Sequence, residues 1–463
     1  MGWVPPAGAA APLNPPGSVT GGPFIRTHEV NVTLNNGFAR TEVDQIFGNT
    51  NPKDYEATYS FPLPKDASLS EVSLWIDGQE IIGEVAEKGK ARRIYREQVA
   101  RGNETALAEK NDYKTFDVHI GRIKAGQDTR VRLVYYQPLS VDLNIGRYVY
   151  PLAEGGVDEE RNDFWSVDNR VRDHFSFNLE LKSAFPVKDV RIPGFQTAAD
   201  IEEISGAEFP GGHYRVALDN RATRNLNKDI VFYYRLADDV PARIELIPYR
   251  ENEGSDGTFM AIVTPAADLK PIDAGTDWLF VLDASGSMEG DKLGTLADGV
   301  SQVLGRMDER DRFHILTFNN NVNPLTRGYV RATDANVRKA IQQVRSIRAV
   351  GGTALFRGLQ AAYRKADADR TTGMILVTDG VANIGPRTHG AFLEQLCGQD
   401  LRLFTFVIGN SANQPLLERL ATASGGFAMN LSDLDDIQGR LLQAKAKVLH
   451  EAMVDADITF KGE

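Results

Sequence analysis

The segment Trp278-Leu-Phe-Val-Leu-Asp283-Ala-Ser285-Gly-Ser287 decides the fold of the C-terminal half of this chain. Its first five residues are continuously apolar, which is typical of a strand buried on both faces of a parallel sheet. An amphipathic helix is predicted next, from apolar residues at three- and four-residue steps: Leu293, Leu296, Val300, Val303 and Met307. The Asp-x-Ser-x-Ser sequence therefore lies on a strand-to-helix turn.

Two further polar residues are predicted at the same edge of the sheet. Asp379, in Thr-Asp-Gly, directly follows the apolar run Met374-Ile-Leu-Val-Thr378, and Thr353, in Gly-Gly-Thr, precedes a helical pattern. Open α/β sheets bind ligands at the carboxyl ends of their strands, near the point where the strand order reverses. We therefore expect five side chains to meet there: Asp283, Ser285, Ser287, Thr353 and Asp379.

Hydroxyls and carboxylates are hard oxygen donors, which suit Mg²⁺, with Ca²⁺ or Mn²⁺ as alternatives. These segments contain no Cys or His that would favour Zn²⁺. Two carboxylates leave room in the coordination shell for water or for an Asp or Glu of a partner. Asp and Ser also cap helices, so the first segment alone is equally consistent with a simple helix start. The three segments together favour a cation site.

Strands and helices alternate through the rest of this half. Strands are predicted at 313–318, 403–408 and 427–430. Helical patterns lie between them, at Val337, Ile341 and Val344; Leu355, Leu359 and Tyr363; Phe392, Leu393 and Leu396; and Leu416, Leu417 and Leu420. Asp334 is a candidate N-cap for the first of these helices. The alternation predicts a doubly wound, Rossmann-like parallel sheet.

The five polar residues resemble the metal-ion-dependent adhesion site of von Willebrand factor type A (VWA) domains. That pattern is Asp-x-Ser-x-Ser, a distant Thr and a distant Asp in Thr-Asp-Gly, and the resemblance covers about residues 275–447. It implies that the serines and the threonine contact the ion directly or through water, and that the aspartates often act through water. It also implies that the last helix, expected at 434–448, moves when the site fills.

Between residues 23 and 270 the pattern changes to short β-runs that alternate apolar and polar residues, which suggests a sandwich. The runs are 29–34, 39–47, 57–61, 72–76, 129–136, 175–181, 213–218 and 230–236. One helical stretch is expected at 87–99. Residues 56–64, 82–88 and 116–120 resemble blocks of the vault protein inter-alpha-trypsin (VIT) domain, over about residues 23–140. Residues 141–270 are expected to extend or bridge that sandwich.

The order VIT then VWA is similar to that of inter-alpha-trypsin inhibitor heavy chains and of bacterial surface proteins of sortase-target type. A chain of 463 residues is too long for one core, so a multidomain protein is expected, α+β in its first half and α/β in its second. The net charge of -11, without a compensating basic block, argues against nucleic-acid binding. No apolar run reaches the roughly 18 residues of a membrane span.

The two ends and the single cysteine add three expectations. Residues 1–22 are rich in Pro, Ala and Gly and are interpreted as a flexible lead-in, and 448–463 as a truncated tail. A signal peptide or anchor would lie outside this segment. Cys397 falls in a helical pattern, where a buried structural role is favoured, and one cysteine excludes an internal disulfide framework.

No catalytic motif is present: the chain has no Gly-x-Ser-x-Gly, His-Glu-x-x-His or phosphate-loop sequence. We therefore expect no enzyme activity and no organic cofactor. The leading hypothesis is an extracytoplasmic adhesion or scaffold module (secreted, periplasmic or cell-surface) that captures an acidic residue of a protein partner through Mg²⁺. Two alternatives remain: a structural envelope protein whose ion only stabilises loops, and an accessory subunit of an intracellular ATPase.

Overall fold

The computed structural model divides the chain into two compact units, residues 1–265 and 266–463. It describes residues 24–50, 52, 55–62, 67–76, 78–83, 93–94, 96–98, 101, 106–111, 115–139, 141–142, 144–152, 170–204, 206, 209–223, 225–226, 229–237, 243–250, 252–264, 275–366, 372–379, 382–386, 388–396, 401–408 and 414–431. The expected lead-in at 1–22, Cys397, the expected helix at 434–448 and the tail at 448–463 lie outside these ranges.

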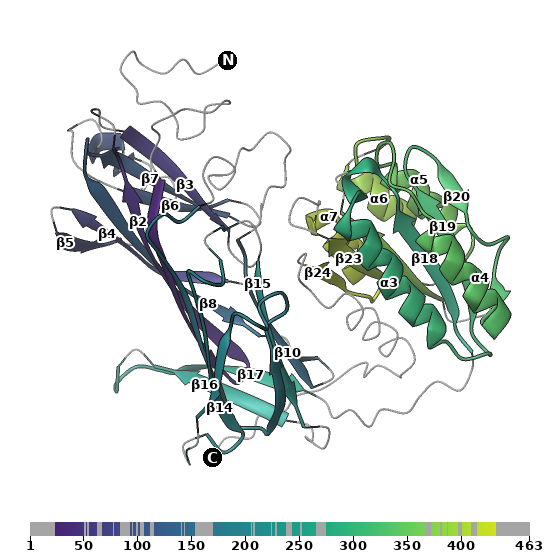
Figure 1. Cartoon of the computed structure of the whole chain (residues 1–463), viewed down its shortest axis with the longest axis horizontal. Coiled ribbons are helices and arrows are strands. Elements are labelled where there is room, and N and C mark those ends of the chain that lie inside the picture. The colour runs from purple at the N-terminus through teal and green to yellow at the C-terminus, as the bar shows by residue number, and fades with distance from the viewer. Residues whose placement is uncertain are drawn as a thin grey trace. The chain divides into compact units, whose positions relative to one another are not determined.

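The first unit is built on an eight-stranded sheet (Figure 1). In spatial order its strands are β13 (Asp200–Glu203), β14 (Gly212–Asp219), β11 (His174–Ser183), β1 (Phe24–Asn35), β2 (Phe38–Gly48), β8 (Asp128–Pro138), β4 (Ser68–Ile76) and β5 (Gln79–Ile82). All neighbouring pairs are antiparallel except β1 and β11, which are parallel. Strands from both sides of residue 140 therefore share one sheet.

A second sheet covers one face of the first. Its strands are β12 (Val187–Arg191), β15 (Ile230–Leu236), β10 (Ile145–Tyr150) and β9 (Val141–Asp142). The Tyr150 hydroxyl on β10 lies 2.8 Å from His28 Nε2 on β1, and the Tyr148 hydroxyl lies 2.8 Å from Thr41 Oγ1 on β2. All four residues are buried, so the interior of this sandwich contains a polar network as well as apolar side chains.

Two smaller sheets complete the first unit. One contains β3 (Tyr55–Pro62), β7 (Thr115–Ile123) and β6 (Ala106–Asn111), and the other is a hairpin of β16 (Arg243–Tyr249) and β17 (Thr258–Thr264). Within the stretch 87–99, the structure describes helical backbone at 93–94 and 96–98, and the other residues of the stretch lie outside the described ranges.

The second unit contains a seven-stranded sheet in the order β20-β19-β18-β22-β23-β24, with β21 also paired to β19. Their bounds are β18 (Asp277–Asp283), β19 (Arg312–Phe318), β20 (Val322–Pro324), β21 (Val330–Arg331), β22 (Thr372–Thr378), β23 (Arg402–Ile408) and β24 (Ala428–Leu431). The five strands from β19 to β24 in the main order run parallel, while β20 and β21 pair antiparallel with β19. Every residue of β18 and β22 is buried, as their continuous apolar runs predict.

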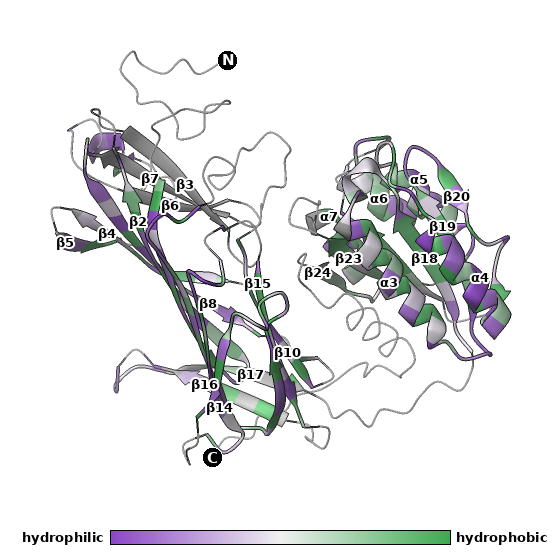
Figure 2. Ribbon diagram, viewed as in Figure 1, coloured by the Kyte–Doolittle hydropathy of each residue, from purple (hydrophilic) through white to green (hydrophobic). Residues whose placement is uncertain are grey.

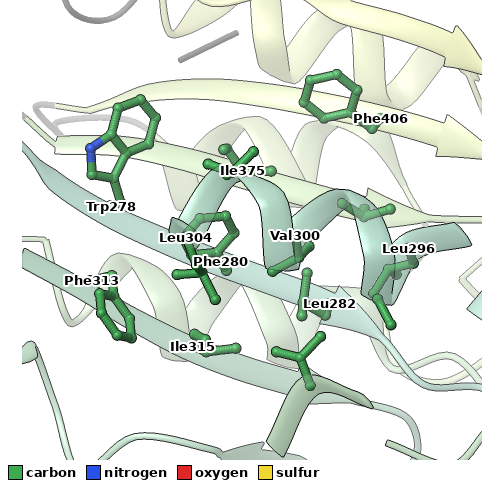
Figure 3. Packing of buried hydrophobic residues seen from close by; sticks show 14 of the residues in the cluster. Trp278, Phe280, Leu282, Leu296, Val300, Leu304, Phe313, Ile315, Ile375 and Phe406 are labelled. Atoms are coloured by element: carbon green, nitrogen blue, oxygen red, sulfur yellow. The ribbon is translucent and has the colours of Figure 1, made fainter. Parts of the chain in front are cut away.

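Helices cover both faces of this sheet. Phe280 and Leu282 pack against α3 (Asp291–Gly305) and α4 (Asp334–Arg345), and Figure 3 shows this core between β18, β19 and α3. The alternate residues Leu279 and Val281 face the other core, which includes α5 (Leu355–Tyr363), α6 (His389–Leu396) and α7 (Gln414–Ala423). The fold class is therefore as predicted: a doubly wound α/β unit that follows a β-rich unit.

Within the described residues, the strand runs and helical patterns predicted for the second unit are confirmed, with two corrections. Met307 lies beyond the end of α3 at Gly305, although it still packs against the core. Asp334 is not the N-cap of α4: Thr333, with an extended backbone, holds that position, and Asp334 is the first helical residue. An acidic side chain in the first turn still interacts favourably with the helix dipole. Figure 2 shows the mixed apolar and polar sides of α3 and α4.

Candidate metal site

The candidate site lies where the strand order of the second unit reverses. The chain runs from β18 to β19 on one side and later returns to β22 on the other side of β18. Asp283 is the last residue of β18, and Asp379 directly follows the last residue of β22. Because the two strands are parallel and adjacent, their carboxyl ends bring both aspartates to one edge of the sheet.

Asp283 is buried and accepts hydrogen bonds at both carboxylate oxygens. Ser285 N donates to Oδ1 across 2.8 Å, and Thr378 Oγ1 donates to Oδ2 across 2.5 Å. Burial raises the pKa of Asp283 to about 6, and the nearby charge of Asp379 adds to this, while the bonds from Thr378 and Ser285 oppose it. Within the described part of the chain no cationic side chain pairs with this carboxylate, and a bound cation would compensate its charge.

The two serines connect to the second aspartate. Ser285 Oγ and Ser287 Oγ are 3.1 Å apart, and Ser287 Oγ donates to Asp379 Oδ1 across 2.7 Å. They precede or form part of the short 3-10 helix η1 (Gly286–Met288), which turns the chain from β18 toward α3. Ser285 and Asp379 are buried, whereas Ser287 is exposed. The hydrogen-bonded set of the two aspartates and the two serines is therefore accessible to solvent at Ser287.

Thr353 lies on a loop that is hydrogen-bonded to the loop of the two serines. Gly286 N donates to Gly351 O across 2.9 Å, and Val350 N donates to Ala284 O across 2.9 Å. These backbone bonds join the loop that carries Thr353 to the loop that carries the serines, and Thr353 itself is buried. The structure thus joins four of the five predicted residues by direct hydrogen bonds and holds the fifth on an adjoining loop.

Two asparagines that the sequence reasoning missed hold the Thr353 loop. Asn320 Oδ1 accepts from Gly352 N across 2.6 Å, and Asn383 Oδ1 accepts from Thr353 N across 2.7 Å. Gly351 has φ +81°, and a Cβ on Gly352 would lie 2.8 Å from Asn383 Oδ1. Asn320 follows the carboxyl end of β19, and this position was the signal in the sequence that could have indicated it.

A lysine also belongs to the site and was not predicted. Lys292, in the first turn of α3, places its Nζ 2.7 Å from Asp379 Oδ2. The side chain of Asp379 is fully buried, while that of Lys292 is 29% exposed. Asp379 therefore pairs with a positive charge on one oxygen and with the Ser287 hydroxyl on the other.

The donor set suits a hard cation. Within the described ranges no group of three or more His, Cys, Asp and Glu side chains is placed to hold a metal ion, so a cation here would depend on hydroxyls as well as carboxylates. Two carboxylates and three hydroxyls are oxygen donors of the kind that Mg²⁺, Ca²⁺ and Mn²⁺ bind. The residues present therefore fit such an ion.

The parallel sheet covered by helices on both faces defines a class of protein built around an open α/β domain. The model of the von Willebrand factor type A domain matches residues 277–443, and that of the vault protein inter-alpha-trypsin domain matches residues 25–135. The chain carries a VIT domain followed by a VWA domain. VWA domains are typically protein-interaction modules.

Curated relatives match most of the length of this chain. Human inter-alpha-trypsin inhibitor heavy chain H3 is 25% identical over 91% of this chain and 47% of its own length. The von Willebrand factor A domain-containing protein 5A of Rattus norvegicus is 20% identical over 94% of this chain and 56% of its own length. The chain spans about half the length of the curated relatives it matches.

Among solved structures, the chain is similar to von Willebrand factor type A from Catenulispora acidiphila, with a TM-score of 0.35 and 18% identity over 45% of this chain and 47% of that one. No helix among the described residues is long and apolar enough to cross a membrane.

Proposed function

We propose that this chain is a divalent-cation-dependent protein-binding module that uses its VWA domain for adhesion or scaffolding. Asp283, Ser285, Ser287, Thr353 and Asp379 would hold the ion, with Mg²⁺ preferred over Ca²⁺ or Mn²⁺. The bound ion would supply a Lewis-acidic position for an Asp or Glu carboxylate of a partner. The observation that carries this proposal is the hydrogen-bonded group formed by Asp283, the two serines and Asp379.

Burial supports a site that is open on one side only. Asp283, Ser285, Thr353 and Asp379 are buried, so the protein encloses them and keeps competing water away. Ser287 is exposed, so an external ligand would approach over this residue. The charges also favour an anionic ligand, because the two carboxylates balance a divalent ion and Lys292 adds one positive charge.

The experiment is calorimetric titration of metal-stripped protein with Mg²⁺, Ca²⁺ and Mn²⁺, beside two variants. Asp379→Asn removes a site carboxylate, while Asp334→Asn removes an exposed carboxylate at the start of α4. We expect saturable one-site binding by the wild type and by Asp334→Asn, and weaker binding by at least about tenfold in Asp379→Asn. Equal affinities in all three proteins would refute the assignment.

We propose that the site binds without catalysis. A serine nucleophile needs a general base that accepts its proton. The Ser287 hydroxyl donates to Asp379 Oδ1, and the Lys292 ammonium donates to Oδ2 of the same carboxylate, so the acceptor is a carboxylate held in an ion pair and not a histidine. The absence of turnover of ester and peptide substrates, with metal binding intact, is the expected result.

We propose an extracytoplasmic location, secreted, periplasmic or on a cell surface, because relatives named as inter-alpha-trypsin inhibitor heavy chains cover most of this chain. Cell fractionation tests it. Recovery of the protein in a cytosolic complex with an ATPase would instead support an intracellular accessory subunit. Metal-dependent melting without any metal-dependent partner would support a structural envelope protein.

A further inference from the structure

The ion pair between Lys292 and Asp379 sits at the position where a metal ion would act. Asp379 Oδ1 accepts from Ser287, and Asp379 Oδ2 accepts from the Lys292 ammonium across 2.7 Å. Both oxygens of this buried carboxylate are therefore occupied by donors, and one donor is a full positive charge. A second cation at Asp379 must share the carboxylate with Lys292 or displace it.

The position of Lys292 in its helix indicates that the lysine stabilises the buried Asp379 carboxylate and not α3. Gly290 is the N-cap, so Lys292 lies in the first turn of α3, where the helix dipole is positive. A cation there is unfavourable for the helix. The buried carboxylate of Asp379 offsets this repulsion, because an unpaired buried charge costs more.

Lys292 can also leave the carboxylate. Its side chain is 29% exposed, and its flexible four-carbon stem allows the ammonium to reach water when Asp379 is neutralised by another cation. A divalent ion and the ammonium at one carboxylate would repel each other, since like charges a few ångströms apart interact strongly in a partly buried site.

We propose that Lys292 is a built-in cation that competes with the divalent ion for Asp379 and so sets the metal affinity of the site. This inference rests on the proposed metal-dependent function. With Lys292 in place, the charges of a filled site would sum to +1, from two aspartates, one lysine and one divalent ion. The filled site therefore favours an anionic ligand, and binding of metal and of a carboxylate becomes mutually supportive.

Three variants test the competition. Lys292→Met removes the charge and keeps the length of the side chain, and Lys292→Arg keeps the charge. Lys339→Met removes a charge from the exposed side of α4 as a matched control. Each protein is stripped of metal, titrated with Mn²⁺ and Mg²⁺ by calorimetry, and melted with and without metal.

We expect Lys292→Met to bind metal about tenfold more tightly than the wild type, because one competing charge is gone. Without metal its melting temperature falls, since Asp379 loses its partner, and the rise on metal addition exceeds that of the wild type. Lys292→Arg and Lys339→Met should bind metal within about twofold of the wild type.

Unchanged metal affinity in Lys292→Met, beside clear binding by the wild type, would overturn this inference and leave the proposed function standing. Absence of metal binding in all four proteins would overturn both. If Lys292→Met is unfolded without metal, recovery of its structure on addition of Mn²⁺ at concentrations too low to saturate the wild type supports the competition, and no recovery opposes it.

Discussion

Thr378 donates its hydroxyl hydrogen to Asp283 Oδ2 across 2.5 Å, which joins the last residues of two adjacent parallel strands. Both residues are buried, so this bond is shielded from water. It orients the first aspartate of the candidate site from β22, the strand that the second aspartate directly follows. This bond couples the two halves of the site, beside the link that runs through Ser285 and Ser287 to Asp379.

Removing that hydroxyl should destabilise the VWA domain. Thr378→Val keeps the shape of the side chain but leaves a buried carboxylate oxygen without its donor, at a cost of about 1–3 kcal/mol. Urea denaturation of metal-free protein measures the free energy of unfolding. Metal affinity should fall in the same variant, because Asp283 loses its orientation.

Thr405→Val is the matched control for this change. Thr405 is buried in β23, and its Oγ1 has no hydrogen-bond partner within the described part of the chain. Replacing an unsatisfied buried hydroxyl by a methyl group should be neutral or stabilising. If Thr378→Val is as stable as Thr405→Val, the bond to Asp283 contributes nothing to the fold.

A methyl group on Gly352 should disturb the loop that carries Thr353. An added Cβ would lie 2.8 Å from both Asn383 Oδ1 and Ile384 Cδ1, so the loop or the asparagine must shift. We expect Gly352→Ala to destabilise the protein by about 1–3 kcal/mol and to weaken metal binding. Thermal melting and calorimetry measure the two effects.

Gly294→Ala is the control for this change, and we expect it to raise the stability of the same domain. Gly294 lies inside α3, and nothing is within 4 Å of its added Cβ. Alanine should stabilise the helix by about 0.5–1 kcal/mol and leave metal affinity unchanged. A Gly352→Ala protein that binds metal like Gly294→Ala would show that the position of Thr353 is not important.

The VIT-containing unit should lose stability in acid because of His28. This ring is buried, contacts Gln45 and Tyr150, and has its pKa lowered from 6.5 to about 3 by burial. Between pH 6.5 and pH 3 the unfolded chain therefore binds a proton that the folded chain does not. The free energy of unfolding of this unit therefore has its full value above about pH 6.5. It falls progressively as the pH drops from 6.5 toward 3, by up to about 1.4 kcal/mol per pH unit.

Urea denaturation between pH 7 and pH 5 measures this slope, followed on the transition of the β-rich unit. His28→Gln should have a smaller slope, whereas His174→Gln, a change at an exposed histidine at the start of β11, should keep the wild-type slope. Identical slopes in all three proteins would assign the acid sensitivity to other groups.

The β16–β17 hairpin presents one apolar face to solvent. Ile244, Leu246, Phe259 and Val263 are 49% to 70% exposed, and the pairing places Ile244 opposite Val263. Because these side chains are uncovered, Ile244→Lys with Val263→Glu should change the free energy of unfolding by no more than about 0.5 kcal/mol. Solubility should rise, because an exposed apolar patch of this kind promotes association.

Static light scattering and urea denaturation check the two expectations for the hairpin. Exchanging the polar and exposed pair Asn252 and Glu253 for Lys and Gln, in the connection between the two strands, serves as a control. A loss of more than about 1 kcal/mol in the hairpin variant alone would show that this apolar face is covered in the folded protein.

The sequence by itself determined most of the VWA domain. Continuous apolar runs predict β18 and β22, and helical periodicity predicts α3 to α7, because buried parallel strands and the helices that cover them leave strong local patterns. The position of Asp283 and Asp379 at strand ends followed from the same runs. Two helix boundaries were wrong, at Met307 and at Asp334, since helix ends depend on backbone angles that the residue pattern does not specify.

Only the tertiary structure decided which side chains meet. The pairing of β1 with β11 joins residues 147 positions apart, as in Thr27 opposite His174, and no local periodicity encodes such a pair. Asn383 and Lys292 likewise reach Thr353 and Asp379 from distant parts of the chain. Periodicity reports which face of an element is buried, whereas hydrogen bonds and ion pairs between loops depend on how the whole sheet closes.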